Sequence, residues 1–135
     1  MNLLNVPIFK RLYPSIVRRY LMLIGKFNID IKVNNLIFEI DIRESIERKT
    51  YFLKEYERKR MEQLHQYSKR NNSEILIDIG AHIGFYSILF SNKLKQIYSF
   101  EPNKRNFMVL TKNIEKNNLK NIKIFKQVCI YGFPK

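Results

Sequence analysis

The chain has 135 residues, and its 25 Lys and Arg against 12 Asp and Glu give a formal net charge of +13. It contains one Cys and two His, so an internal disulfide is excluded and a structural zinc site lacks ligands. No apolar run approaches the roughly 18 residues that a membrane-spanning helix needs. These counts favour one domain in a reducing, cytoplasmic setting.

The positive charge is uneven along the chain. Residues 1–27 sum to +5, residues 28–70 to +2, residues 71–101 to −1 and residues 102–135 to +7. Basic flanks of this kind are typical of proteins that contact an anionic membrane or nucleic acid. The abundance of Lys, Asn and Ile also fits a coding sequence rich in A and T, which requires no partner. We favour this second interpretation.

The first half of the chain predicts a helix, a hairpin and a second helix. Residues 14–26 place apolar side chains at helical spacing beside two arginines, which predicts a basic amphipathic helix packed on its own domain or, alternatively, on a membrane surface. Residues 28–42 alternate between apolar and polar on both sides of Asn34 and Asn35, which predicts a β-hairpin. Residues 44–70 predict one helix. Its apolar stripe consists of Leu53, Tyr56, Met61, Leu64 and Tyr67.

From residue 73 the pattern changes to short strands that alternate with helices. The expected strands are residues 75–79, 96–100 and 122–128, and the expected helices are residues 84–91 and 103–117. This alternation predicts an α/β fold with parallel βαβ units. We divide the chain into residues 1–72, with the helices and hairpin, and residues 73–135, the first βαβαβ half of a Rossmann-like sheet.

Residues 74–87 carry the most informative chemical signal. An apolar strand brings Asp78 to its carboxyl end, and Gly80 and Gly84 form the turn into the next helix. Ligands of parallel sheets bind at this end, where glycines allow close approach of the backbone and the helix N–H groups attract an anion. The next strand brings Glu101 to the matching position, where a carboxylate can accept hydrogen bonds from both hydroxyls of a ribose. The two acids and the glycine loop predict a nucleoside ligand.

The composition of this loop favours S-adenosylmethionine over a dinucleotide. A dinucleotide fingerprint reads G-x-G-x-x-G, whereas this loop reads G-A-H-I-G and lacks the middle glycine. Asp78 would repel a pyrophosphate but attract an ammonium and a sulfonium. A turn without a ligand, in which Asp78 caps the helix, is the alternative. The loop alone is compatible both with an S-adenosylmethionine site and with a turn that binds no ligand.

A longer set of motifs supports the first interpretation. Residues 77–87 and the Phe100-Glu-Pro-Asn-Lys-Arg-Asn106 segment, followed by Leu110, Asn113 and Asn117, resemble the FkbM-type family of S-adenosylmethionine-dependent methyltransferases. Residues 42–48 and Tyr56-Glu57 also resemble the region that precedes the loop in that family. The resemblance covers about residues 40–128. It implies a Rossmann-like methyltransferase with S-adenosyl-L-methionine as cofactor and a hydroxyl of a sugar, polyketide or other small natural product as acceptor.

The resemblance also assigns roles to single residues. It places Asp78, Gly80 and Gly84 at the methionine part of the cofactor, Glu101 at the ribose hydroxyls and Pro102 near the adenine. His82 either contacts the cofactor or makes a structural hydrogen bond. No metal ligand set is found, and His65 is interpreted as a surface residue.

The helix expected after Glu101 combines polar and apolar residues with structural roles. Asn106 is expected to brace its first turn, and Asn113 and Asn117 are interpreted as structural, with Asn117-Asn118 ending the helix. The apolar residues Phe107, Leu110 and Ile114 form a core stripe.

The end of the chain departs from the family pattern. Residues 128–135 do not resemble the family's continuation, and the sheet is truncated after the third parallel strand. No catalytic base can be assigned, because loops after later strands build the acceptor site in this architecture. We expect an amino-terminal fragment of a longer methyltransferase, with strand 75–79 as an exposed hydrophobic edge that promotes aggregation. A second chain that supplies the missing half is the alternative.

Two other functions remain open. One is a basic binding module that holds nucleic acid or an anionic membrane through Arg18, Arg19 and the Lys-rich tail, without catalysis. The other, a nicotinamide-dependent oxidoreductase, is disfavoured by Asp78 and by the missing glycine. For the methyltransferase we expect a small-molecule or carbohydrate acceptor, no specific nucleic acid, and peripheral contact with an anionic membrane through residues 10–26.

Overall fold

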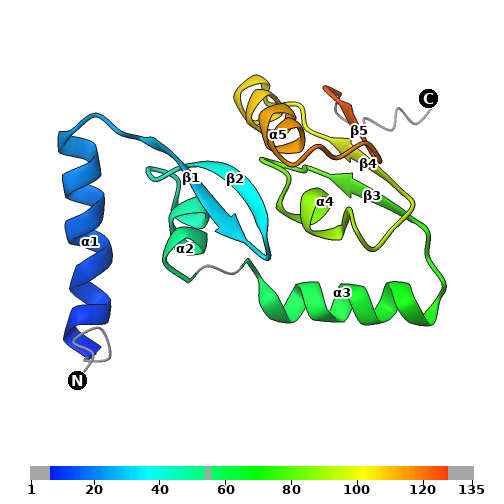
Figure 1. The fold of residues 1–135 in the computed structure, drawn as a ribbon, viewed down its shortest axis with the longest axis horizontal. Helices are drawn as coiled ribbons and strands as arrows, with labels where there is room; N and C mark the ends of the chain where they lie inside the picture. Colours follow the sequence, from blue (N-terminus) through cyan, green and yellow to red (C-terminus); the bar gives the residue numbers. More distant parts are fainter. Residues whose placement is uncertain (1–6, 54–55, 128–135) are drawn as a thin grey trace, which may run out of the picture.

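The computed structural model describes residues 7–53 and 56–127. In these residues, a β-hairpin and several helices lie around a three-stranded parallel sheet (Figure 1).

Helix α1 (Pro7–Leu23) is longer than the sequence predicted and stands beside the rest of the chain (Figure 1). The expected start at Pro14 is wrong, because Pro7 occupies the first position, where a missing N–H costs little. The side chains of Ile16, Tyr20 and Leu23 are 63%, 61% and 85% exposed, whereas Val17 and Leu21 lie beside Tyr51 and Phe52. Packing on its own domain is thus only partial, and membrane contact through residues 10–26 stays a prediction. Among the described residues, no helix is long and apolar enough to cross a membrane.

The predicted hairpin is confirmed. Strands β1 (Asn28–Val33) and β2 (Leu36–Asp41) pair antiparallel, with Val33 opposite Leu36. Asn34 and Asn35 join them with φ angles of 49° and 67°, the left-handed region that Asn tolerates better than most residues.

The single helix expected over residues 44–70 is wrong, since two helices occupy this segment. These are α2 (Ser45–Leu53) and α3 (Arg58–Arg70), and Glu57 precedes α3 with a left-handed φ of 38°. Helix α2 buries Glu47 and Thr50, and α3 packs Met61 and Leu64 against the core and leaves Tyr67 65% exposed. The left-handed Glu57 therefore separates two helices where the sequence predicted one.

The carboxyl-terminal half has the predicted α/β topology. Strands β3 (Ile75–Ile79), β4 (Gln96–Phe100) and β5 (Ile122–Phe125) form a parallel sheet in the order β3-β4-β5. Helix α4 (Phe85–Phe90) follows β3, and α5 (Lys104–Lys116) follows β4. This arrangement confirms the Rossmann-like sheet. Strand β5 ends earlier than expected, and the proposed departure at residues 128–135 lies outside the described residues.

The core lies on only one face of the parallel sheet. The hairpin, α4 and β4 contribute its buried side chains, which include Val33, Phe38, Phe85, Ile88, Phe90 and Ile97. On the opposite face of β3, Ile75, Ile77 and Ile79 are 57%, 62% and 68% exposed. Strand β3 is also the first strand of the order β3-β4-β5, so the expected exposed hydrophobic edge is confirmed. Aggregation through it stays a prediction.

Asn113 connects the hairpin to the parallel unit. This fully buried side chain on α5 accepts a hydrogen bond from the Glu39 N–H at 2.7 Å, and its Nδ2 donates to the Ile83 carbonyl at 3.0 Å. Asn117, one turn later, pairs in the same way with the backbone of Ile37 at the edge of the molecule. The interpretation of both residues as structural is confirmed.

We expect Asn113→Ala to lower the free energy of unfolding by about 2 kcal/mol, because it leaves buried backbone groups of β2 and of the loop after β3 without partners. Asn117→Ala is the matched control and should cost less, about 0.5 kcal/mol, because water can replace its more exposed bonds. Urea denaturation of both variants measures the difference. Equal losses would contradict the role given to Asn113.

Candidate functional site

The two predicted acids meet at the carboxyl edge of the sheet. The parallel register pairs the last residues of β3 and β4, so Asp78 and Glu101 reach the same edge. The chain after β3 crosses the end of β4, where the Gly80 and Ala81 N–H groups both donate to the Phe100 carbonyl, at 2.9 and 3.0 Å. Residues 80–84 are called the glycine loop below.

The Glu101 carboxylate connects the glycine loop with the loop after β4. Its Oε2 accepts a hydrogen bond from the His82 N–H at 2.8 Å, and its Oε1 accepts one from the Asn103 N–H at 2.9 Å. The residue is only 5% exposed, so the carboxylate is held in one orientation. Because each carboxylate oxygen has two acceptor sites, both can accept one further hydrogen bond. This geometry fits the two hydroxyls of a ribose.

His82 occupies the place of the missing middle glycine. Its φ of 54° lies in the left-handed region, which His adopts more readily than most side chains. The tight turn of the loop thus forms without a glycine there, and the missing glycine alone does not exclude a dinucleotide. The stronger argument is the negative charge of Asp78, which would repel a pyrophosphate.

Asp78 is anchored to the following helix. The Ser87 hydroxyl donates to Asp78 Oδ2 at 2.5 Å and lies 2.6 Å from the hydroxyl of Ser99, and both serines are fully buried. Burial raises the pKa of Asp78, the Ser87 hydrogen bonds oppose this shift, and the nearby Glu101 charge adds to it. A carboxylate in such surroundings is stabilised by a cation. Asp78 therefore links β3 to α4 and also suits a positively charged ligand group.

The two glycines of the loop face different surroundings. Gly80 is exposed, and a β-carbon added there would meet no atom within 4 Å. Gly84 is buried, and a β-carbon there would lie 2.5 Å from Leu110 Cδ1. Gly80 thus leaves room for a ligand, whereas Gly84 allows α4 to pack against α5. Contact of Gly84 with a cofactor stays a prediction.

The residues after Glu101 form the start of α5. Pro102 is exposed beside Glu101, and its place near an adenine stays a prediction. The Asn103 side chain caps the helix by accepting hydrogen bonds from the N–H groups of Arg105 and Asn106, at 3.0 and 3.2 Å. The expected bracing by Asn106 is wrong, because Asn103 supplies the accepting oxygen.

The sequence did not reveal a group of charged side chains behind the glycine loop. Glu47 on α2 is 1% exposed, and its Oε1 lies 3.8 Å from His82 Nε2. Asp41 is 3% exposed and pairs with Arg43 at 2.6 Å and with Arg105 of α5. An acid in a highly charged helical segment normally lies on the solvent face, so no sequence signal indicated that Glu47 is buried.

These two acids have opposite pKa shifts. Burial raises the pKa of Glu47 to about 7, although a backbone hydrogen bond from Asp41 opposes the shift. Burial also acts to raise the pKa of Asp41, but the hydrogen bonds and charge of Arg43, with Arg105, outweigh it and lower the pKa. Asp41 is therefore a stable ion-pair partner at neutral pH, whereas Glu47 changes its protonation state there.

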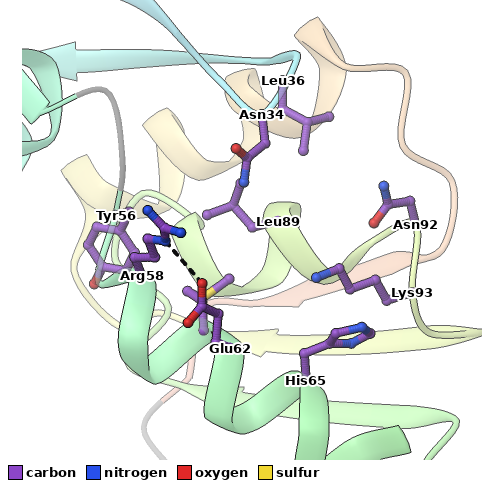
Figure 2. A pocket seen from close by; sticks show the side chains of 10 residues that line it. Asn34, Leu36, Tyr56, Arg58, Glu62, His65, Leu89, Asn92 and Lys93 are labelled. Atoms are coloured by element: carbon purple, nitrogen blue, oxygen red, sulfur yellow. Dashed lines mark hydrogen bonds and ion pairs between the residues drawn. The ribbon is translucent and has the colours of Figure 1, made fainter.

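A separate cavity of about 430 Å³ lies between the hairpin turn, α3 and the end of α4 (Figure 2). Its lining includes Asn34, His65, Leu89 and Lys93, and no residue of the glycine loop. His65 is half-buried there, with its Nδ1 buried and its ring beside Phe90, so the interpretation of His65 as a surface residue is wrong. The cavity is distinct from the edge where Asp78 and Glu101 meet.

The comparisons with known proteins show the fold. No family model and no curated protein match the chain. The solved structure of M. jannaschii TYW2 in complex with AdoMet is 22% identical, with a TM-score of 0.55 over 73% of this chain and 42% of that chain. P. horikoshii TYW2 in complex with MeSAdo is 17% identical, with a TM-score of 0.56 over 91% of this chain and 50% of that chain.

A third similar structure is the M. jannaschii tRNA m1G37 methyltransferase, 22% identical with a TM-score of 0.54. The match covers 76% of this chain and 30% of that chain. The chain thus spans half or less of the length of these three proteins. Identities this low carry the architecture but no activity. The chain has the Rossmann-like fold of these three structures.

Proposed function

We propose that this chain is the S-adenosylmethionine-binding part of a methyltransferase. The observation that carries the proposal is the Glu101 carboxylate, which the His82 and Asn103 amides hold at the sheet edge with accepting capacity left over. Exposed Gly80 and the partly buried Asp78 lie at the same edge. Two structures of the same fold were solved with AdoMet and MeSAdo, which supports this choice of nucleoside.

The residues of this edge would share the binding of the cofactor. Glu101 would accept the ribose hydroxyls, Pro102 would lie beside the adenine, and the open backbone at Gly80 would receive the methionine part. Asp78 would stabilise its positive charge. The bound cofactor supplies an electrophilic methyl group on a sulfonium. Binding and orientation are what this part of the chain contributes, and they account for much of the rate of an in-line displacement.

The methyl acceptor that we propose is a hydroxyl of a sugar or other small natural product, as the FkbM-type resemblance implies. A tRNA is the second candidate, because the similar structures include an enzyme named as a tRNA methyltransferase. The net charge of +13 would favour any anionic polymer. Both acceptor classes are compatible with a cytoplasmic enzyme, and we propose that this protein is cytoplasmic.

The test is calorimetric titration of the 135-residue chain with S-adenosylmethionine, S-adenosylhomocysteine and NAD. We expect binding of the two adenosyl ligands and none of NAD. A chain that is folded by circular dichroism and binds neither adenosyl ligand would contradict the proposal.

Filter binding of tRNA at increasing salt tests the second acceptor and also the rival function, a basic binding module without catalysis. Salt-sensitive tRNA binding without any cofactor binding would favour that module.

A further inference from the structure

Glu47 is a buried carboxylate that the proposed cofactor contacts do not use. Its Oε2 accepts a hydrogen bond from the Asp41 N–H at 2.5 Å. Its Oε1 is buried and has no hydrogen-bond partner among the described residues, and His82 Nε2 lies 3.8 Å away. A buried oxygen without a donor is costly, so the imidazole is the group placed to satisfy it after a small rotation of the ring.

The charged groups that face this pair come from every element around it. They are Asp41 at the end of β2, Glu44 in the turn before α2, Arg105 on α5 and Glu101 at the end of β4. Burial raises the pKa of Glu47 to about 7 and lowers the pKa of His82, against the negative charges of Glu101 and Glu44. Both groups therefore favour their neutral forms, and Glu47 gains or loses its proton near neutral pH.

The protonation state of Glu47 decides which nitrogen of His82 carries the hydrogen. A neutral imidazole has one N–H group and one nitrogen lone pair. An ionised Glu47 accepts a hydrogen bond from Nε2–H, which leaves the lone pair on Nδ1. A protonated Glu47 donates to Nε2, which places the hydrogen on Nδ1. The His82 side chain is 37% exposed although its Nε2 lies 3.8 Å from the buried acid, so a ligand at the glycine loop can reach part of this side chain.

We propose that Glu47 is a positioning residue of the cofactor site, which sets the tautomer of His82 and, in its ionised form, prepares the glycine loop for S-adenosylmethionine. The proposal rests on the cofactor binding proposed above. The ammonium and ribose hydroxyls of the cofactor are hydrogen-bond donors, which an Nδ1 lone pair can accept. The ammonium and sulfonium are cations, which a negative charge behind the loop favours.

The sign of the pH dependence follows from this preference. If only the ionised form of Glu47 accepts the cofactor, the apparent affinity is the intrinsic affinity multiplied by the fraction of chains in which Glu47 is ionised. With the pKa of Glu47 at about 7, the affinity rises as the pH increases through neutrality. Between about pH 6 and about pH 8 the expected rise is about tenfold.

The experiment is calorimetric titration of the chain with S-adenosylmethionine across this pH range. Glu47→Gln keeps an oxygen for the Asp41 N–H but cannot ionise, so its affinity should change by less than about twofold. His82→Asn, whose side chain tolerates the left-handed backbone, removes the tautomer and leaves only the direct charge of Glu47, so its pH dependence should be smaller than that of the native chain. A Glu47→Gln variant that keeps the tenfold dependence would overturn the proposal.

Two further measurements separate this proposal from other causes. Glu44→Gln removes an exposed carboxylate from the same surroundings and should keep the pH dependence. The ¹⁵N chemical shifts of His82 report its tautomer without any ligand, and we expect the tautomer to change through about pH 7 in the native chain but not in Glu47→Gln. If no cofactor binds at any pH, the proposed function fails, while a tautomer that does not respond to pH sinks the Glu47 inference separately.

Discussion

Glu101→Gln is expected to weaken the binding of S-adenosylhomocysteine by about 100-fold. The substitution keeps the shape of the side chain but removes the charge that would accept the ribose hydroxyls. In the native chain the His82 and Asn103 N–H groups hold the carboxylate at 2.8 and 2.9 Å. In the variant, the NH2 of the glutamine side chain would face one of these two donors and could not accept its hydrogen bond. Hydrogen bonds to a charged group contribute about 1.5–3 kcal/mol each, so two weakened contacts account for the loss.

Calorimetric titration of the native chain and the variant at one pH measures this effect. Glu74→Gln is the matched control, because Glu74 lies before the opposite end of β3, is exposed and pairs with Lys95. Its affinity should equal that of the native chain. A Glu101→Gln variant that is folded and binds as well as the control would remove Glu101 from the site.

The parts of the site that the sequence predicted depend on short-range geometry. The spacing of Asp78, the loop glycines and Glu101 fixes their common edge once the strands are parallel, and parallel pairing follows from the alternation of strands and helices. The hairpin turn at Asn34 and Asn35 is equally local, because two adjacent residues that tolerate positive φ determine it.

The parts that it did not predict depend on contacts between distant segments. Glu47 is buried because α2 packs against β2 and places the side chain behind His82, 35 positions further along the chain. The break before α3 requires Glu57 in a left-handed conformation, which its residue type does not signal. Ser87 and Ser99 form the buried hydroxyl pair beside Asp78 only after β4 pairs with β3. A single sequence gives no periodicity or motif for such pairs.

Gly84→Ala is expected to lower the free energy of unfolding by about 3 kcal/mol. The φ of 93° is strained for any L side chain, and the new β-carbon would lie 2.5 Å from Leu110 Cδ1 and 3.0 Å from Ile88 Cδ1. Leu110 and Ile88 are both fully buried, so neither can move without disturbing the core. Strain contributes about 1 kcal/mol and overpacking about 2 kcal/mol. Urea denaturation of the variant measures the total.

Gly80→Ala separates the packing role of one glycine from the ligand-facing role of the other. Its φ of 77° brings a similar strain, but the new β-carbon meets no atom within 4 Å, so the expected loss is only about 1 kcal/mol. The same open space is where the methionine part of the cofactor would approach, so Gly80→Ala should weaken cofactor binding far more than its small stability loss explains. If both variants lose equal stability, the close approach of Leu110 and Ile88 to Gly84 does not limit the packing of α4, because these contacts distinguish Gly84 from Gly80.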